Sequence, residues 1–212
     1  MNKLFDMPAV LTGDIVNSTL LPPQREKKLL NILDTIMKGH RHEFFRGDSF
    51  QTYLHDAGEA LKTALLCRTA AIALDPNADK VLTDVRVSIG IGEVVSPIGS
   101  LATAKGEAFL ISGRALDALQ KTEGRLIIVT ENKITALAFE VMSDYINSIY
   151  REMTPKQAEV VLELLNGNNQ QQAAENLKRS KSTISQHVTA GRWEEINKIL
   201  NTYNRLVQLA SL

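Results

Sequence analysis

The chain has 212 residues, 24 basic and 24 acidic side chains, one cysteine and 44% hydrophobic residues, enough to build one large or two small globular domains. The single cysteine, Cys67, excludes a disulfide-stapled scaffold and a cysteine zinc cluster. Zero net charge gives no general affinity for nucleic acid or membranes, so any such affinity must be local. Without a membrane-length apolar run or the apolar core of a secretion signal, the sequence predicts a cytoplasmic protein with no membrane partner.

The first 130 residues alternate between β-branched runs and segments with apolar residues at three-and-four spacing, which is typical of an α/β or α+β domain. The expected elements are a strand at 8–16, a helix at 22–39, two strands within 42–54 joined at Gly47-Asp48, a helix at 56–74, a strand at 83–95, a helix at 106–122 and a strand at 125–130. The order β-α-β-β-α-β, followed by one more helix and strand, predicts a ferredoxin-like sheet.

Strand signals stop after Thr130, and residues 131–212 are helical in composition. A fresh helix starts at Thr154 with Pro155 in its first position, so we expect a domain boundary near residue 151. Three segments, at 154–165, 170–177 and 181–189, have the lengths and small alanines of a helix-turn-helix unit. The fold class expected is therefore α+β: a sheet domain at 1–150 followed by an all-α helix-turn-helix domain at 151–212.

The third of these segments has a one-sided charge, with no acidic residue between Leu177 and Trp193. Its cations could engage phosphates, and its short polar groups could reach base edges in a major groove of double-stranded DNA. The alternative is that the cations only solvate a helix face. The predicted DNA-binding residues are Lys178, Arg179, Ser180, Lys181, Ser182, Thr183, Ser185, Gln186 and His187.

After Gly191, apolar residues recur in a heptad-like seam. The members are Trp193, Ile196, Leu200, Tyr203 and Val207. Two interpretations compete. The seam either packs on the chain's own domains or forms a homodimer interface that presents two recognition helices to two half-sites, and the second is slightly favoured.

Two carboxylates in the first region are candidate metal ligands. Asp14 lies near the end of the first strand and Asp48 in the hairpin, and a ferredoxin-like sheet places these strands side by side. Shared divalent cations such as Mg²⁺ or Mn²⁺ would suit triphosphate chemistry. Each aspartate also has a structural explanation, because Gly-Asp favours a tight turn and Asp14 can make local turn hydrogen bonds.

The order DIVNST, GDSF, VSIGIGEV and GEAFLISGRAL resembles the class III nucleotidyl cyclase domain over residues 8–130. The resemblance implies metal binding by Asp14 and Asp48 and nucleotide phosphate binding by Arg114. It also departs from the family: Phe44 and Leu110 stand where active cyclases carry a purine-recognising lysine and a catalytic asparagine. These losses imply a domain without catalytic residues.

The segment from Met153 to Val188 is similar to the helix-turn-helix of bacterial transcription regulators and of sigma-factor promoter-binding regions. The combination with a degenerate cyclase-like domain resembles the SatD family, whose members are regarded as regulators. The sequence therefore predicts a DNA-binding transcriptional regulator, not an enzyme, with a sensory or dimerisation domain for a small molecule or nucleotide. The alternative is an active metal-dependent nucleotidyl cyclase or related phosphoryl-transfer enzyme.

Overall fold

The computed structural model describes residues 7–45 and 47–210. The first region contains β1 (Ala9–Val16), α1 (Pro23–Met37), β2 (Arg41–Phe45), β3 (Ser49–Leu54), α2 (Ala60–Ile72), β4 (Asp84–Ile91), α3 (Glu107–Leu119) and β5 (Leu126–Thr130). Five further helices follow: α4 (Lys133–Arg151), α5 (Pro155–Leu165), α6 (Gln170–Asn176), α7 (Lys181–Ala190) and α8 (Trp193–Ala210). The α+β class and the order of the first eight elements are as predicted.

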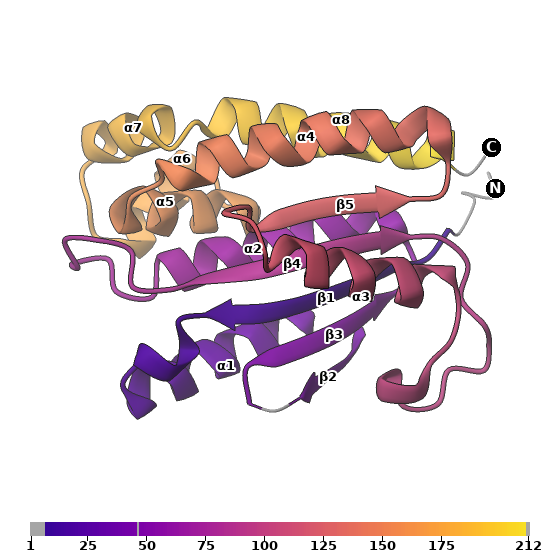
Figure 1. Cartoon of the computed structure of the whole chain (residues 1–212). Helices are drawn as coiled ribbons and strands as arrows, with labels where there is room; N and C mark the ends of the chain where they lie inside the picture. The colour runs from indigo at the N-terminus through magenta and orange to yellow at the C-terminus, as the bar shows by residue number, and fades with distance from the viewer. Residues whose placement is uncertain (1–6, 46, 211–212) are drawn as a thin grey trace.

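The five strands form one mixed sheet in the order β2-β3-β1-β4-β5 (Figure 1). β1 is central and pairs antiparallel with both β3 and β4, whereas β4 and β5 are parallel. The predicted hairpin joins β2 to β3, with Gly47 in the left-handed region at φ 86°. Because β1 lies between β3 and β4, the ends of these strands can present side chains to one shared site.

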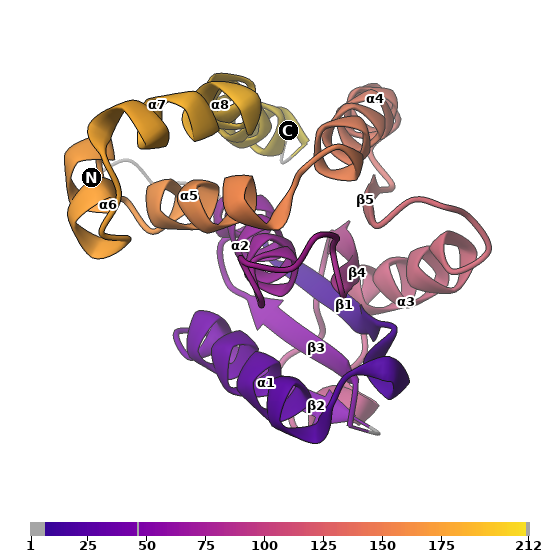
Figure 2. The ribbon, with the colours of Figure 1, turned by 90° about the vertical axis from the view of Figure 1, so that its left-hand side faces the viewer.

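Helices cover both faces of the sheet. Figure 2 shows α1 and α2 on one face and α3 on the other. Leu11, Val87 and Ile89 point to the α1 and α2 face, where they join Leu61 and Leu65 in the main apolar core. The alternation of strand side chains leaves Asp14 and Arg86 on the opposite face, beside α3.

The glycine-containing strand at 83–95 marks a close backbone approach, as its sequence predicts. A Cβ atom at Gly90 would lie 2.4 Å from the carbonyl oxygen of Ala108, so α3 packs directly on the backbone of β4. Ser88 and Ser112 complete this contact, since the Ser88 hydroxyl donates to the Ser112 carbonyl at 2.6 Å. The position of α3, and of Gln120 beyond its end, follows from this contact.

The helices after residue 151 share the main core of the sheet region. Ala158, Val161 and Leu165 of α5 lie in the same apolar cluster as Leu61 and Leu65 of α2. A second, smaller cluster joins α5, α6 and α7. Its buried members are Val160, Leu164, Ala173, Ala174, Ile184 and Val188. The expected boundary at 151 falls between α4 and α5, and a continuous core extends across it.

The heptad-like seam of α8 packs within the chain. Ile196, Tyr203 and Val207 are buried in the main core. The Tyr203 hydroxyl donates to the carbonyl of Ala57 at 2.8 Å, and its ring centroid lies 5.7 Å from that of Phe139. The first of the two interpretations of this seam is therefore the one observed.

Cys67 lies on the packed side of α2 and is fully buried. Burial raises the pKa of its thiol to about 12, so the reactive thiolate is absent at neutral pH. We expect a thiol-specific disulfide reagent at pH 8 to leave Cys67 unmodified in the folded chain and to modify it fully in urea. Rapid modification without urea, at a rate similar to that of a free thiol, would contradict this placement.

Candidate functional site

The residues predicted to read DNA lie along α7, from Lys181 to His187, and in the three positions before it. Ser180 caps the helix as predicted, since its hydroxyl accepts from the backbone N–H of Thr183 at 3.1 Å. Most of the set is exposed, namely Lys178, Ser180, Lys181, Ser182, Ser185 and Gln186, while Arg179, Thr183 and His187 are half-buried. Arg179 forms an ion pair with Glu159 of α5 at 2.5 Å, which removes one cation from the predicted surface.

His187 of this set stays neutral more readily than a free histidine. Partial burial, together with the nearby charges of Arg179 and Lys156, lowers the pKa of its imidazole. The role of the whole set in DNA binding stays a prediction.

Asp14 and Asp48 lie at the same end of the sheet, in β1 and just before the neighbouring β3, as the sequence predicts. Asp14 stands opposite Ser49 in the β1–β3 register, so Asp48 is one residue from its partner position. The two carboxylates have different partners. Asp14 accepts hydrogen bonds from Arg86 and Gln120, whereas Asp48 accepts from the Ser18 hydroxyl at 2.9 Å.

This end of the sheet does not fit a preformed divalent metal centre. Both oxygens of Asp14 already face the Arg86 guanidinium, at 3.1 and 3.0 Å. Within 7–45 and 47–210, no three His, Cys, Asp or Glu side chains are grouped so that they could hold a metal ion. Asp14 therefore balances the charge of Arg86, whereas Asp48 accepts a hydrogen bond from the Ser18 hydroxyl.

The other positions named from the cyclase resemblance lie on the surface or in the sheet. Arg114 is exposed on α3, and its role in nucleotide binding stays a prediction. Leu110 is 52% exposed on the same helix. Phe44 of β2 packs against Phe50 of β3, with ring centroids 6.1 Å apart, so its side chain stabilises the β2–β3 hairpin.

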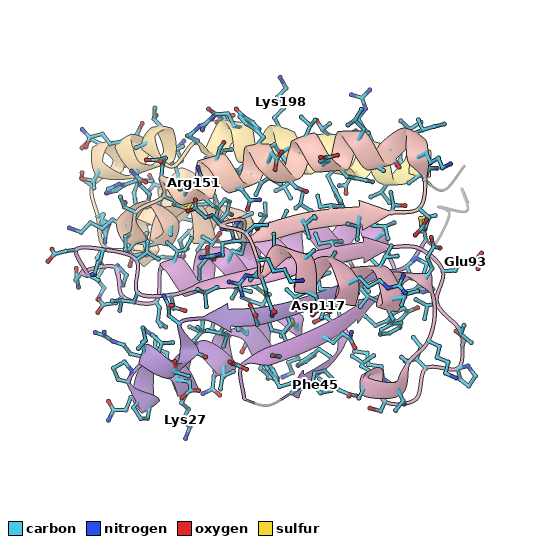
Figure 3. The ribbon with its side chains drawn as sticks, viewed as in Figure 1. Lys27, Phe45, Glu93, Asp117, Arg151 and Lys198 are labelled. Carbon is cyan, nitrogen blue, oxygen red and sulfur yellow. The ribbon has the colours of Figure 1, made fainter. Side chains whose placement is uncertain are left out.

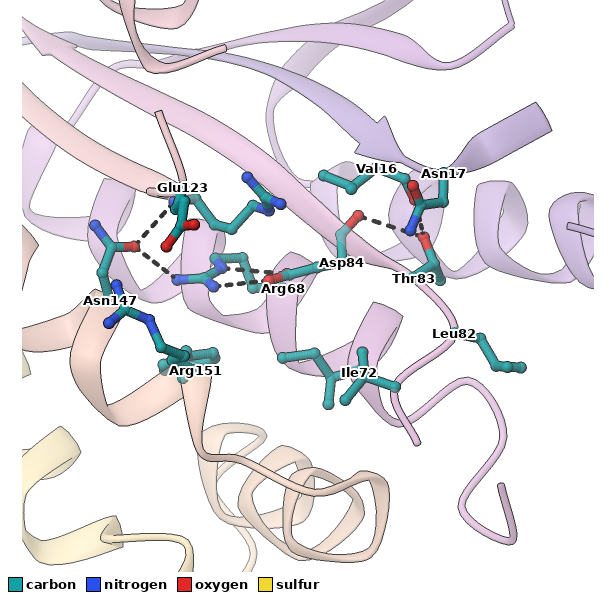
Figure 4. Close-up of a pocket in the computed structure, with 13 residues that line it drawn as sticks. Val16, Asn17, Arg68, Ile72, Leu82, Thr83, Asp84, Glu123, Asn147 and Arg151 are labelled. Carbon is teal, nitrogen blue, oxygen red and sulfur yellow. Dashed lines mark hydrogen bonds and ion pairs between the residues drawn. The ribbon is translucent and has the colours of Figure 1, made fainter. Parts of the chain in front are cut away.

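A pocket of about 230 Å³ lies where β1 ends and β4 and β5 begin, and its lining includes Val16 and Asn17, which follow Asp14 closely in the chain (Figure 4). It is lined by three arginines, two carboxylates and several neutral groups. The lining residues that carry charge or polar groups are Asn17, Arg68, Thr83, Asp84, Glu123, Arg125, Asn147, Tyr150 and Arg151. Figure 3 shows Arg151 at the end of α4, on the same side of the molecule as the starts of β4 and β5.

Arg68 is the fixed cation of this pocket. Its side chain is 2% exposed, and it donates to both oxygens of Asp84, from Nη2 at 2.7 Å and from Nε at 3.2 Å. Asn147 accepts from Nη1 at 3.4 Å, and the guanidinium carbon lies 4.5 Å from the centre of the Tyr150 ring. These contacts hold the guanidinium in one orientation before any ligand arrives.

Arg125 is a half-buried cation of this pocket. Its Nη1 donates to the carbonyl of Gly124 at 3.1 Å, and among the described residues no ion pair within 4.0 Å joins it to a carboxylate. Burial lowers the pKa of its guanidinium, and the charges of Arg86 and Arg68 lower it further. An anion in the pocket would relieve this repulsion.

Sequence reasoning missed Arg68, Arg86 and Arg125. One signal was present, because Arg68 directly follows Cys67 within an alanine- and leucine-rich segment whose other cation is Lys62. A cation at such a position needs a buried partner. The identity of that partner depends on the sheet register, which the sequence alone does not determine.

Comparison with protein families assigns the class of the protein. The family model described as the PD-(D/E)XK nuclease superfamily matches residues 47–208, which is most of the chain. The chain belongs to this superfamily. The match begins at the hairpin turn before β3, includes β3, β4 and β5, and ends within α8. Of the residues that line the arginine-lined pocket, only Val16 and Asn17 lie outside it.

Two solved structures, each titled as a bacterial light-regulated adenylyl cyclase, are similar to this chain. The first has 19% identity, a TM-score of 0.43 and coverage of 57% of this chain and 42% of that chain. The second has 17% identity, a TM-score of 0.38 and coverage of 61% and 46%. The chain thus spans less than half the length of either structure. Among curated proteins, none matches.

The prediction of a DNA-binding transcriptional regulator is wrong, and so is the prediction that the chain is not an enzyme. Both are overturned by the nuclease superfamily match over residues 47–208. The match treats the sheet region and the C-terminal helices as one unit, and neither the SatD-like resemblance nor a separate helix-turn-helix domain is supported. Of the described helices, none has the length and hydrophobicity needed to cross a membrane.

The superfamily's name includes an acidic residue, any residue and a lysine in succession. Residues 131–133, Glu-Asn-Lys, have this spacing, and they lie after β5, at the opposite end of that strand from Arg125. Asn132 caps α4 by accepting from the backbone N–H groups of Ile134 and Thr135. It also donates to the carbonyl of Ala210 at 3.2 Å. Asn132, the middle residue of the three, thus has a structural role at this helix start.

Proposed function

We propose that the protein is a phosphoryl-transfer enzyme of the nuclease class, which binds a substrate phosphodiester in the arginine-lined pocket. The observation that carries this proposal is the convergence of Arg68, Arg125 and Arg151 on one cavity within the segment matched by the nuclease superfamily. Guanidinium groups present paired donors that match the oxygens of a phosphate. Two carboxylates line the same cavity, so the excess of one positive charge favours an anion.

The roles of the cations differ because their partners differ. Arg125 donates to a neutral carbonyl and retains donors for a phosphate oxygen. Arg68 is held by Asp84 and Asn147, so it supplies a fixed positive charge. Charges oriented before the reaction stabilise negative charge that develops in a transition state without the cost of reorienting them.

Glu123 is the carboxylate in this pocket that could exchange a proton with the reacting groups. Asp84 is committed to Arg68, whereas Glu123 is exposed at the rim. In the proposed step Glu123 accepts a proton from a water that attacks phosphorus, the P–O bond to the leaving nucleotide oxygen breaks, and that oxygen takes a proton from solvent. No step in this proposal passes through a metal ion, since the residues present do not fit one.

Replacing Glu123 by glutamine is expected to reduce the rate of phosphodiester cleavage by about 100-fold, since the amide cannot accept the proton. Substrate affinity should not fall, because the residue keeps its size and the pocket loses a negative charge near the phosphate. Single-turnover cleavage of a labelled oligonucleotide measures both quantities. The matched control is Glu131→Gln at the other end of the sheet, which is expected to keep the wild-type rate. Loss of activity in the control and not in Glu123→Gln would move the site to residues 131–133.

The proposal is tested by incubating the purified chain with single-stranded DNA, double-stranded DNA, RNA and ATP, each with and without Mn²⁺. Cleaved oligonucleotide is the expected product. Cyclic nucleotide from ATP, without cleavage of any polynucleotide, would favour a cyclase. Absence of any product in all eight reactions would contradict an enzymatic role.

A further inference from the structure

Arg86 of β4 forms a close, partly buried pair with Asp14 of β1. The two residues stand directly opposite each other in the antiparallel register, and their side chains are 15% and 16% exposed. Nη1 of Arg86 lies 3.1 Å from Oδ1 and 3.0 Å from Oδ2 of Asp14. Gln120, just after α3, adds a third hydrogen bond to Oδ2 at 2.9 Å.

We propose that Arg86 is the resident counter-cation of Asp14, that it excludes a divalent cation from this end of the sheet, and that the adjoining pocket binds phosphate without metal. The first two parts stand on the Asp14 geometry alone. The third part rests on the proposed function. Arg86 is a positioning residue in this account, because it acts through Asp14 and through the charge of the pocket wall.

Entry of a divalent cation at Asp14 would require the guanidinium to leave. Arg86 would then remain a largely buried charge without its carboxylate, which is a costly state. Its Nε is already buried without a hydrogen-bond partner, so the Asp14 pair is the main compensation for this side chain among the described residues.

The charge of Arg86 also reaches the pocket. It acts on Arg125, which lines the pocket: burial lowers the pKa of the Arg125 guanidinium, and the charge of Arg86 lowers it further. A divalent cation added at Asp14 would bring two further positive charges to a region that already contains Arg68, Arg86 and Arg125. The positive charges of these arginines therefore repel a divalent cation and attract an anion in the same region.

The first experiment is a titration of the wild-type chain with Mn²⁺ alone, in which free Mn²⁺ is followed by electron paramagnetic resonance. We expect no binding that depends on Asp14. The Arg86→Met variant should gain Mn²⁺ binding, and the further change Asp14→Asn should abolish that gain. Arg86→Lys keeps a cation of similar reach and should exclude Mn²⁺ as the wild type does. Thermal melting of each variant establishes that it is folded.

Mn²⁺ binding by the wild type that Asp14→Asn removes would overturn the proposal. So would a folded Arg86→Met chain that gains no Mn²⁺, since the guanidinium would then not be what excludes the metal. Pyrophosphate serves as the probe of the pocket. The proposal expects equal affinity in EDTA and in Mn²⁺, and an absolute requirement for Mn²⁺ would overturn its third part. If pyrophosphate fails to bind under either condition, the proposed function fails at this pocket, while the Mn²⁺ titration still decides the role of Arg86.

Discussion

Replacing Arg68 by alanine is expected to lower the free energy of unfolding by about 3–5 kcal/mol, the range found when one partner of a buried ion pair is removed. The loss has three sources. The Asp84 carboxylate, which is 15% exposed, would be left without its cation. Asn147 Oδ1 would lose the hydrogen bond that Arg68 donates, and the Tyr150 ring would lose the guanidinium that lies over its face. Urea denaturation followed by circular dichroism measures the change. A loss below about 1 kcal/mol, the value typical of exposed pairs, would contradict this account of the pocket wall.

A double variant separates the pair from general packing. Arg68→Met keeps much of the length of the side chain, and Asp84→Asn removes the charge that would be left behind. We expect the double variant to be more stable than Arg68→Met alone, because the uncompensated carboxylate is the costly element. If the two changes are simply additive, the coupling between Arg68 and Asp84 is absent and the pair does not organise the pocket.

Replacing Tyr203 by alanine is expected to cost about 3–5 kcal/mol, as for other large buried aromatic residues. Its side chain is fully buried, packs against Phe139 of α4 and donates to the carbonyl of Ala57. Tyr203→Phe keeps the ring and leaves only that carbonyl without its donor, so it should cost about 1–3 kcal/mol. Equilibrium denaturation measures both variants, and the difference between them isolates the hydroxyl.

The same denaturation curves test whether the C-terminal helices belong to the main core. Tyr203 joins α8 to the segment before α2, so its loss should shift one cooperative transition of the whole chain. A second transition, in which α5–α8 unfold while the sheet remains, would contradict the shared core. Fluorescence of Trp193, the one tryptophan of the sequence, follows the C-terminal helices, and circular dichroism follows the secondary structure of the whole chain, so curves that do not coincide would reveal the second transition.

Much of the local structure could be predicted because its signals are local. Thr154 and Gln157 form the capping box that starts α5, and Pro155 follows the cap, as the sequence pattern predicts. Ser180 caps α7 for the same reason. The position of β1 in the centre of the sheet followed from the β-α-β-β-α-β order, so Asp14 and Asp48 could be placed at one end.

The chemistry of that end could not be predicted, because it depends on pairings between distant residues. Asp14 meets Arg86 only through the β1–β4 register, and Arg68 meets Asp84 only where α2 crosses the start of β4. The charge pattern of α7 was visible in the sequence, but Glu159, which neutralises Arg179, comes from another helix. A function inferred from the charges of a single segment missed these partners.

The most direct test of the arginine-lined pocket compares the rate of phosphodiester cleavage by the wild type, Arg125→Ala and Arg205→Ala. Arg205 is an exposed arginine of α8 outside the pocket, so its variant controls for the loss of one positive charge. We predict that Arg125→Ala lowers the rate by about 100-fold, as for other groups that stabilise transition-state charge, and that Arg205→Ala keeps the wild-type rate. Equal rates for all three folded chains would contradict the assignment of the phosphate to this pocket.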